Sequence, residues 1–125
     1  MLSRGERKKV LVIEDHAPTA DMIGQLLDMI DLDFSLAPDG PRGLELAVTV
    51  QPDLILLDIM MPQMNGIEVC KALKSSPRTK HIPVIIVSVR GSNDMKIAGQ
   101  EAGAVEHVVK PFDPAELIKI IKKYI

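Results

Sequence analysis

Residues 53–62 read Asp53-Leu-Ile-Leu-Leu-Asp58-Ile-Met-Met-Pro62, an apolar run that is followed directly by a carboxylate. The run does not alternate with polar residues, so both faces of the strand that it forms should be covered. A strand buried on both faces is typical of a parallel sheet. The stretch therefore predicts a central parallel strand that carries Asp58 at its carboxyl end.

Further strand candidates lie on either side of this stretch. Nearly continuous apolar runs occupy Val10–Ile13 and Pro83–Val87, and weaker ones occupy Val105–Val109 and Asp33–Ala37. Each contains the aliphatic residues that favour strands. With the central run they predict five strands.

The segments between these runs have helical spacing. The first apolar stripe consists of Met22, Ile23, Leu26, Leu27 and Ile30. Turn or cap residues open later helices at 39–41, 65–66 and 113–114, and Ser92–Ala102 reads as a helix with little apolar surface. Alternating strands and helices predict an α/β fold, a five-stranded parallel sheet with helices on both faces in three α/β/α layers.

Composition limits the class of protein. The 125 residues are 46% hydrophobic, which suits a single domain at 9–125 after a short polar tail at 1–8. Aromatic residues make up only 2% and the net charge is −2, which argues against direct nucleic-acid binding. A single cysteine excludes an internal disulfide, and no apolar run is long enough for a membrane span. We expect a cytoplasmic protein without membrane contact.

Charged or hydroxyl side chains follow four of the predicted strands. They are Glu14 and Asp15 after the first, Asp58 after the third, Ser88 after the fourth and Lys110 after the fifth. Ligands of open parallel sheets bind at the carboxyl ends of the strands. Three carboxylates at one edge would repel one another, and a hard cation such as Mg²⁺ would relieve that repulsion.

Four stretches together resemble a known family. They are Val10-Leu-Val-Ile-Glu-Asp15, Asp53–Pro62 followed by Asn65-Gly66, Val84-Ile-Ile-Val-Ser88, and Val109-Lys-Pro-Phe112. With these spacings along the chain they resemble the receiver domain of two-component response regulators over nearly the whole chain. The resemblance implies the flavodoxin-like strand order 2-1-3-4-5, which would place Asp15 and Asp58 on neighbouring strands.

The resemblance also implies the chemistry of the site. Asp58 would be the phosphoacceptor, and its carboxylate would attack the phosphorus of a phosphohistidine. Mg²⁺ or Mn²⁺ would be bound by Asp15, Asp58 and the backbone carbonyl of Met60, with Glu14 acting through water.

Further residues receive roles from the same resemblance. Ser88 would donate a hydrogen bond to the phosphoryl group, and Lys110 would neutralise its charge. Pro62, Gly66 and Pro111 would shape the loops around it.

Output would depend on the fourth helix, fifth strand and fifth helix, which phosphorylation would switch together with Ser88. His107 stands where the family usually has Tyr or Phe, and we expect it to couple weakly and with pH sensitivity. The implied partners are a sensor histidine kinase or phosphotransfer protein and a downstream effector protein or domain. The resemblance also allows a dimer that depends on phosphorylation.

Other functions stay open at this point. The chain could be a degenerate receiver-like interaction domain that acts constitutively. A flavin-binding or aspartyl-phosphatase member of a similar fold is a weaker alternative, because Glu14-Asp15 would repel a phosphate and Met60 stands where such phosphatases carry a second Asp. We expect no enzymatic activity beyond self-phosphorylation and slow autodephosphorylation at Asp58. The chain is either a stand-alone receiver or part of a larger regulator or hybrid kinase.

Overall fold

The computed structural model describes residues 7–61, 64–89 and 93–125. Strands and helices alternate along this part of the chain. They are β1 (Lys9–Ile13), α1 (Ala17–Met29), β2 (Asp33–Ala37), α2 (Gly40–Val50), β3 (Leu54–Leu57), α3 (Gly66–Ser75), β4 (Val84–Ser88), α4 (Asn93–Glu101), β5 (Glu106–Val109) and α5 (Pro114–Tyr124).

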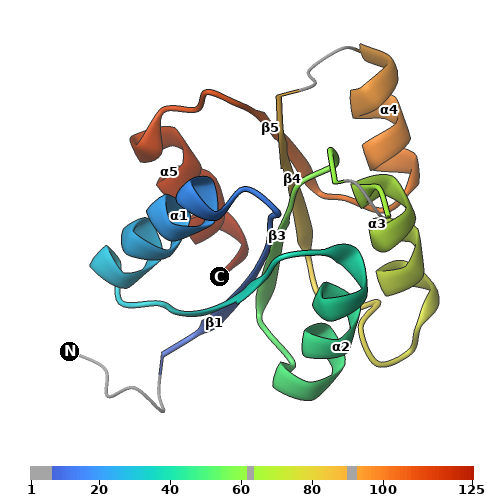
Figure 1. Cartoon of the computed structure of the whole chain (residues 1–125), viewed down its shortest axis with the longest axis horizontal. Coiled ribbons are helices and arrows are strands. Elements are labelled where there is room, and N and C mark those ends of the chain that lie inside the picture. The colour runs from blue at the N-terminus through green and yellow to red at the C-terminus, as the bar shows by residue number, and fades with distance from the viewer. Residues whose placement is uncertain (1–6, 62–63, 90–92) are drawn as a thin grey trace.

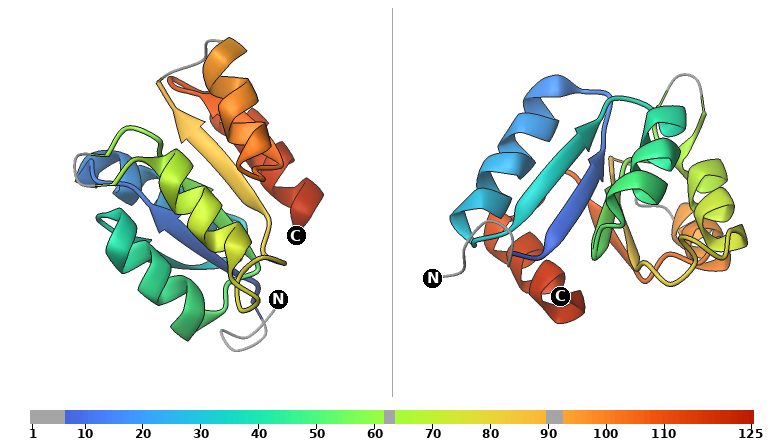
Figure 2. Two further views of the ribbon diagram at one scale, coloured as in Figure 1. Left: turned by 90° about the vertical axis from the view of Figure 1, so that its right-hand side faces the viewer. Right: turned by 90° about the horizontal axis from the view of Figure 1, so that it is seen from below.

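The strands form one parallel sheet in the order β2-β1-β3-β4-β5. Helices α1 and α5 lie on one face of the sheet, and α2, α3 and α4 lie on the other (Figures 1 and 2). The predicted strand order and the three-layer α/β/α architecture are confirmed. The order brings β1 and β3 side by side, so that the residues after them leave the sheet at the same edge.

Two apolar cores flank the sheet, and alternate residues of each strand divide between them. In β1, Leu11 and Ile13 belong to the core under α2 and α3, whereas Val10 and Val12 belong to the core under α1 and α5. All four are nearly inaccessible to solvent. Burial on both faces explains why the strand sequences do not alternate between apolar and polar residues.

Side-chain caps begin three of the helices. Asp39, Asn65 and Asp113 each accept a backbone N–H bond from the first turn, at 2.8, 3.0 and 2.9 Å respectively. Each cap follows the loop at the carboxyl end of a strand, so it fixes where that loop ends and the helix begins. The cap expected at Asp113 is confirmed, and the turns expected at 39–41 and 65–66 do open helices.

Helix α4 packs lightly, as its sequence indicates. Gly99 is its one buried residue among those described in the helix, while Ile97 is 52% exposed. Ser92, the first residue of the predicted helix, lies outside the described residues. A helix with so little buried apolar surface is inexpensive to displace.

One part of the predicted helix pattern is wrong. The helical spacing predicts Met22 in the buried stripe of α1, but its side chain is 41% exposed. The buried face of α1 is centred on Ala20, Ile23, Gly24 and Leu27, and Met22 lies a full residue step, about 100°, away from Ile23. Three strands also differ by one residue from the predicted runs, since β1 begins at Lys9, β4 is Val84–Ser88 and β5 begins at Glu106.

None of the helices in the described part of the chain has both the length and the apolar character that crossing a membrane requires.

Candidate functional site

Three carboxylates meet at the carboxyl edge of the sheet. Glu14 and Asp15 follow β1 and Asp58 follows β3, and the last residues of these two strands are register partners. One carboxylate oxygen from each of Glu14, Asp15 and Asp58 lies within 4.8 Å of the others. The juxtaposition expected from the sequence is confirmed.

The three acidic groups differ in their surroundings. Glu14 and Asp58 are only 4% and 6% exposed, whereas Asp15 is exposed. The backbone N–H of His16 donates to Glu14 Oε2 at 3.3 Å, and that of Met60 donates to Asp58 Oδ1 at 3.1 Å. These bonds hold the two buried carboxylates in place and leave Asp15 at the solvent side of the cluster.

Lys110 brings the positive charge of the site from the end of β5. Its ammonium forms an ion pair with Glu14 Oε1 and lies 3.8 Å from Asp58 Oδ2. Its backbone N–H donates to the carbonyl oxygen of Ser88 at 2.8 Å, and the bond between Lys110 and Pro111 is cis. Lys110 therefore reaches from the end of β5, past the end of β4, to the carboxylates that follow β3 and β1.

Burial and the neighbouring charges shift the pKa values of the two inner carboxylates in opposite directions. Burial and, after it, the adjacent Glu14 raise the pKa of Asp58 to about 7, against the opposing effects of the Met60 N–H and Lys110. Burial also acts to raise the pKa of Glu14, but the contacts with Asp58 and Lys110 outweigh it and lower that pKa overall. The pair therefore favours an ionised Glu14 beside an Asp58 that readily takes up a proton.

Ser88 and His107 lie on the neighbouring strands. Ser88 ends β4, is fully buried and is the register partner of Val109, the residue before Lys110. His107 is half-buried on β5, opposite Ile86 of β4, and sits beneath α4 near Gly99. Ser88 thus reaches the edge that carries the carboxylates, while His107 lies between the sheet and α4, outside the acidic cluster.

The loop after Asp58 requires a glycine where α3 begins. The N–H of Gly66 donates to the carbonyl oxygen of Ile59 at 2.9 Å. A Cβ at position 66 would lie 2.6 Å from the Cα of Ile59 and would also clash with the Asp58 carbonyl oxygen. The close approach of these two backbone segments supports the expected importance of Gly66, whereas Pro62 lies outside the described residues.

Two contacts of the site were missed at the level of sequence. The backbone of Met60 was expected to contribute through its carbonyl, but its N–H also binds Asp58. Lys110 was expected to face a phosphoryl group, and it pairs with Glu14. The only signal for the second contact was that both residues follow strands whose ends share one edge.

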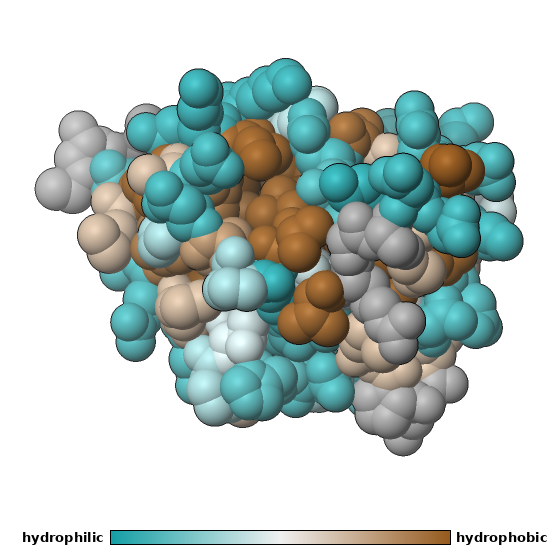
Figure 3. All heavy atoms as spheres, turned by 90° about the horizontal axis from the view of Figure 1, so that it is seen from above, coloured by the Kyte–Doolittle hydropathy of each residue, from teal (hydrophilic) through white to brown (hydrophobic). Residues whose placement is uncertain are grey.

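Apolar residues surround the opening of the site. Figure 3 looks onto the end of the molecule where β4 leads to α4, and apolar residues gather near the middle of this face among hydrophilic ones. Met60 and Val89, which follow β3 and β4, are 45% and 62% exposed. An apolar rim around a charged site favours contact with another protein.

The donor set defines the chemistry that the cluster can support. Its side chains offer only carboxylate oxygens, which suit a hard divalent cation such as Mg²⁺, and offer no sulfur or imidazole ligand. A divalent cation would also offset the repulsion between the buried carboxylates. A carboxylate that lies beside such a cation and a lysine can act as a nucleophile toward an anionic substrate.

Comparison with known proteins agrees with this arrangement. Residues 10–122 match the family model described as the response regulator receiver domain. The chain is 38% identical over 114 residues to the DNA-binding dual master transcriptional regulator RpaA of Synechocystis, covering 91% of the chain and 47% of RpaA. It is 38% identical over 115 residues to the phosphate regulon transcriptional regulatory protein PhoB of Pseudomonas aeruginosa, covering 92% of the chain and 50% of PhoB.

The chain thus spans about half the length of these two curated relatives. Among solved structures, the chemotaxis protein CheY4 of Vibrio cholerae superimposes with a TM-score of 0.90 at 29% identity, over 95% of this chain and 99% of CheY4. The receiver domain of the Francisella response regulator 1452 gives a TM-score of 0.87 at 34% identity, over 94% and 96% of the two chains. The chain belongs to the family of response regulator receiver domains.

Proposed function

We propose that Asp58 accepts a phosphoryl group from a phosphohistidine on a sensor histidine kinase or a phosphotransfer protein. A carboxylate oxygen of Asp58 would bond to phosphorus while the bond from phosphorus to the histidine nitrogen breaks. The electron pair of that bond would stay on the imidazole, which then takes up a proton. The product would be an acyl phosphate on Asp58.

Each neighbouring group has a part in this transfer. The Met60 N–H would hold one oxygen of Asp58 and leave the other to attack. Lys110, 3.8 Å from Asp58, would counter the charge of the incoming phosphoryl oxygens, and Ser88 would donate a hydrogen bond to one of them. These roles assign a function to Asp58, Ser88 and Lys110, which end or directly follow β3, β4 and β5.

Receiver domains bind Mg²⁺ at an acidic pocket, and this chain offers one in Glu14, Asp15 and Asp58. When bound, Mg²⁺ or Mn²⁺ would neutralise charge on the carboxylates and on the phosphoryl oxygens. Asp15, Asp58 and the Met60 carbonyl would be the direct ligands, with Glu14 acting through water. The pKa of Asp58 is about 7 without the cation. A bound cation would lower this pKa and so keep Asp58 ionised for attack at neutral pH.

The observation that carries the proposal is the convergence of oxygens from Glu14, Asp15 and Asp58 within 4.8 Å, with the Lys110 ammonium against them. A degenerate receiver would need to have lost part of this set. The acidic pair after β1 would repel a flavin phosphate at the same edge, which disfavours a flavin-binding protein. An aspartyl phosphatase is disfavoured because Met60 stands where such enzymes carry their second Asp.

The output would be a change in the arrangement of α4, β5 and α5 that a downstream protein or domain reads. The light packing of α4 supports this, since Gly99 is its one buried residue among those described. His107, between β5 and α4, would connect the site to that surface. Couplings of this kind amount to about 1–3 kcal/mol.

Intact mass spectrometry tests the proposal. The protein would be incubated with Mg²⁺ and a small phosphodonor, and compared with Asp58→Asn and with Asp94→Asn, which alters an exposed carboxylate on α4. We expect one phosphoryl adduct on the parent and on Asp94→Asn, and none on Asp58→Asn. An adduct that persists in Asp58→Asn would refute the assignment of the acceptor.

A further inference from the structure

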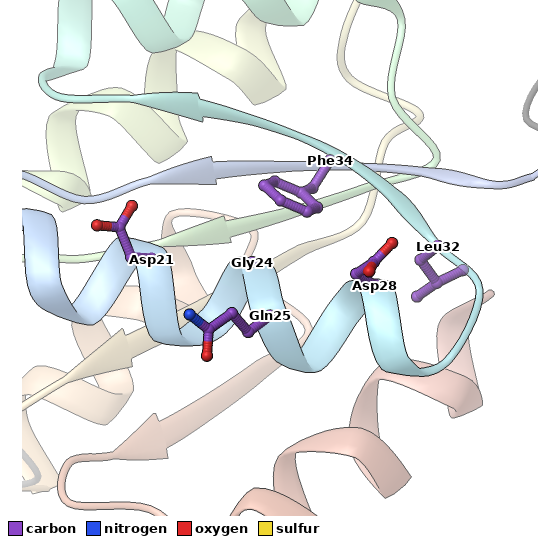
Figure 4. Close-up of a pocket in the computed structure, with 6 residues that line it drawn as sticks. All are labelled: Asp21, Gly24, Gln25, Asp28, Leu32 and Phe34. Atoms are coloured by element: carbon purple, nitrogen blue, oxygen red, sulfur yellow. The ribbon is translucent and has the colours of Figure 1, made fainter.

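A surface pocket of about 500 Å³ lies between α1 and β2, away from the acidic cluster. Strand β2 is at the edge of the sheet, and α1 covers the face next to it. The residues that line the pocket are Asp21, Gly24, Gln25, Asp28, Leu32 and Phe34 (Figure 4). None of them takes part in the proposed phosphoryl transfer.

The missing side chain of Gly24 makes room for the Phe34 ring at the pocket. The Phe34 ring lies over this glycine, and a Cβ at position 24 would be 2.7 Å from the ring atom Cε2. Phe34 is 39% exposed, while Leu32 beside it is only 6% exposed. The floor of the pocket is therefore an aromatic ring that solvent or a partner can reach.

Carboxylates flank this ring on both sides. Asp21 and Asp28 are exposed, lie two helical turns apart on α1, and stand at either side of Phe34, with Gln25 between them (Figure 4). Asp31 and Asp33 add negative charge at the end near Asp28.

The chain itself already places one guanidinium in this acidic region. Arg7 lies 3.4 Å from Asp28 and 3.3 Å from Asp31, and Asp33 is 3.9 Å away. One arginine thus faces several carboxylates at one end of the pocket. The geometry of these pairs shows that a guanidinium can approach Asp28 without displacing α1 or β2.

We propose that the pocket receives an arginine side chain of a partner protein. The aliphatic stem and the guanidinium plane would lie on the Phe34 ring. The charge would be countered mainly by Asp21, because Arg7 already compensates part of the charge of Asp28. Arginine fits better than lysine because its planar group stacks on a ring and offers several donors to carboxylates at once. Gln25 would accept a hydrogen bond from the same group through its side-chain oxygen.

The partner is therefore a protein with a basic surface that lies along α1 at the β2 edge. Arginine is enriched among the residues that dominate protein interfaces, which suits an anchor of this kind. A single side chain at an exposed site binds weakly, so the remaining affinity would come from neighbouring contacts. The proposal does not depend on phosphorylation of Asp58.

Titration with a minimal probe tests the pocket directly. Isotope-labelled protein, without phosphodonor, would be titrated at constant ionic strength with N-acetyl-arginine amide and separately with N-acetyl-citrulline amide, which has a similar shape but no charge. We expect the arginine probe to shift the backbone amide signals of Gly24, Gln25 and Phe34 and to bind at least about threefold more tightly than the citrulline probe.

Variants decide whether the named residues form the site. Asp21→Asn and Phe34→Leu should each weaken the arginine probe at least about twofold, because one removes charge and the other removes the ring. Gly24→Ala should do the same by pushing the Phe34 ring out of place. Glu101→Gln, which alters an exposed carboxylate on α4, should have no effect.

Several results would overturn the proposal. Equal binding of the two probes would show that charge is not recognised, and unchanged binding to Asp21→Asn or Phe34→Leu would place the probe elsewhere. An equal loss in Glu101→Gln would indicate general attraction to an acidic protein. Shifts of the same amide signals with protein concentration alone would assign the surface to a second copy of this chain instead.

Discussion

The ammonium of Lys110 and the carboxylate of Glu14 form an ion pair between the ends of β5 and β1. These strands are not neighbours, since β3 and β4 lie between them. Both side chains are largely buried, with 15% and 3% of their surface exposed. The pair therefore joins the two sides of the site above the end of β3, where Asp58 stands.

Removing the ammonium of Lys110 should destabilise the folded protein, because the buried carboxylate of Glu14 then lacks its counter-charge. Lys110→Met leaves Glu14 without its cation, and we expect a loss of stability on the order of 2–4 kcal/mol. Adding Glu14→Gln should recover part of that loss, because the uncompensated charge is then gone. Urea unfolding of the two single variants and the double variant measures the coupling. Strictly additive losses would show that the pair contributes nothing.

The pKa of Asp58 predicts a pH-dependent stability. Folding raises this pKa from about 3.8 to about 7, so the folded protein binds the proton more tightly than the unfolded chain. Stability should therefore fall as the pH rises through that window, and the full cost should be present above it. Asp58→Asn removes the cost and should stabilise the protein by on the order of 1–2 kcal/mol at about pH 8 without divalent cations, a value reduced for solvent screening.

Urea unfolding at a series of pH values checks this prediction. The advantage of Asp58→Asn should shrink as the pH is lowered toward 4, and Asp94→Asn should show no comparable advantage at any pH. A constant advantage across the series would mean that the charge of Asp58 is not its origin.

The loop after β3 predicts that a side chain at position 66 lowers the stability of the protein. Gly66→Ala should destabilise the protein by about 1–3 kcal/mol, because the new Cβ meets backbone atoms of Asp58 and Ile59 that cannot turn away. Gly99→Ala is a matched control, since its Cβ would clash only with the movable end of the Ile86 side chain and would lie at ordinary contact distance, 4.0 Å, from His107 Nδ1. Thermal unfolding compares the two variants. Equal effects would argue against the tight approach of α3 to Asp58.

The histidine on β5 predicts a switch that differs from that of relatives with an aromatic residue. His107→Tyr should strengthen the response of α4 and β5 to phosphorylation and remove its pH dependence, because a phenol ring does not gain charge near neutrality. Amide chemical shifts of the two elements, before and after phosphorylation at about pH 6 and about pH 8, measure this response. Identical responses of the parent and the variant at both pH values would remove His107 from the switch.

Much of the fold can be predicted from patterns in the amino-acid sequence. Unbroken aliphatic runs such as 54–57 and 84–87 identify central strands, because only a strand covered on both faces tolerates them. The convergence of Asp15 and Asp58 follows from strand order, since parallel strands end at one edge. The cap at Asp113 follows equally from the local sequence, because Asp followed by Pro is typical of a helix start.

Other features depend on where side chains meet in space. Met22 and Ile23 are adjacent and apolar, and the sequence alone could not show that only Ile23 faces the core. The reach of Lys110 to Glu14 depends on a long side chain with several rotamers. The Phe34 ring can lie against α1 because a residue on that helix, Gly24, lacks a side chain. Such long-range pairings leave no periodic signal.

Binding of Mg²⁺ tests the central claim most directly. The chain has no tryptophan, so titration calorimetry or amide chemical shifts should follow binding to the parent and to Asp15→Asn, Asp58→Asn and Glu101→Gln. If the carboxylates after β1 and β3 hold the ion together, the first two variants should lose about tenfold or more in affinity, and Glu101→Gln should match the parent. Equal affinity in all four proteins, or no binding to the parent, would contradict the account.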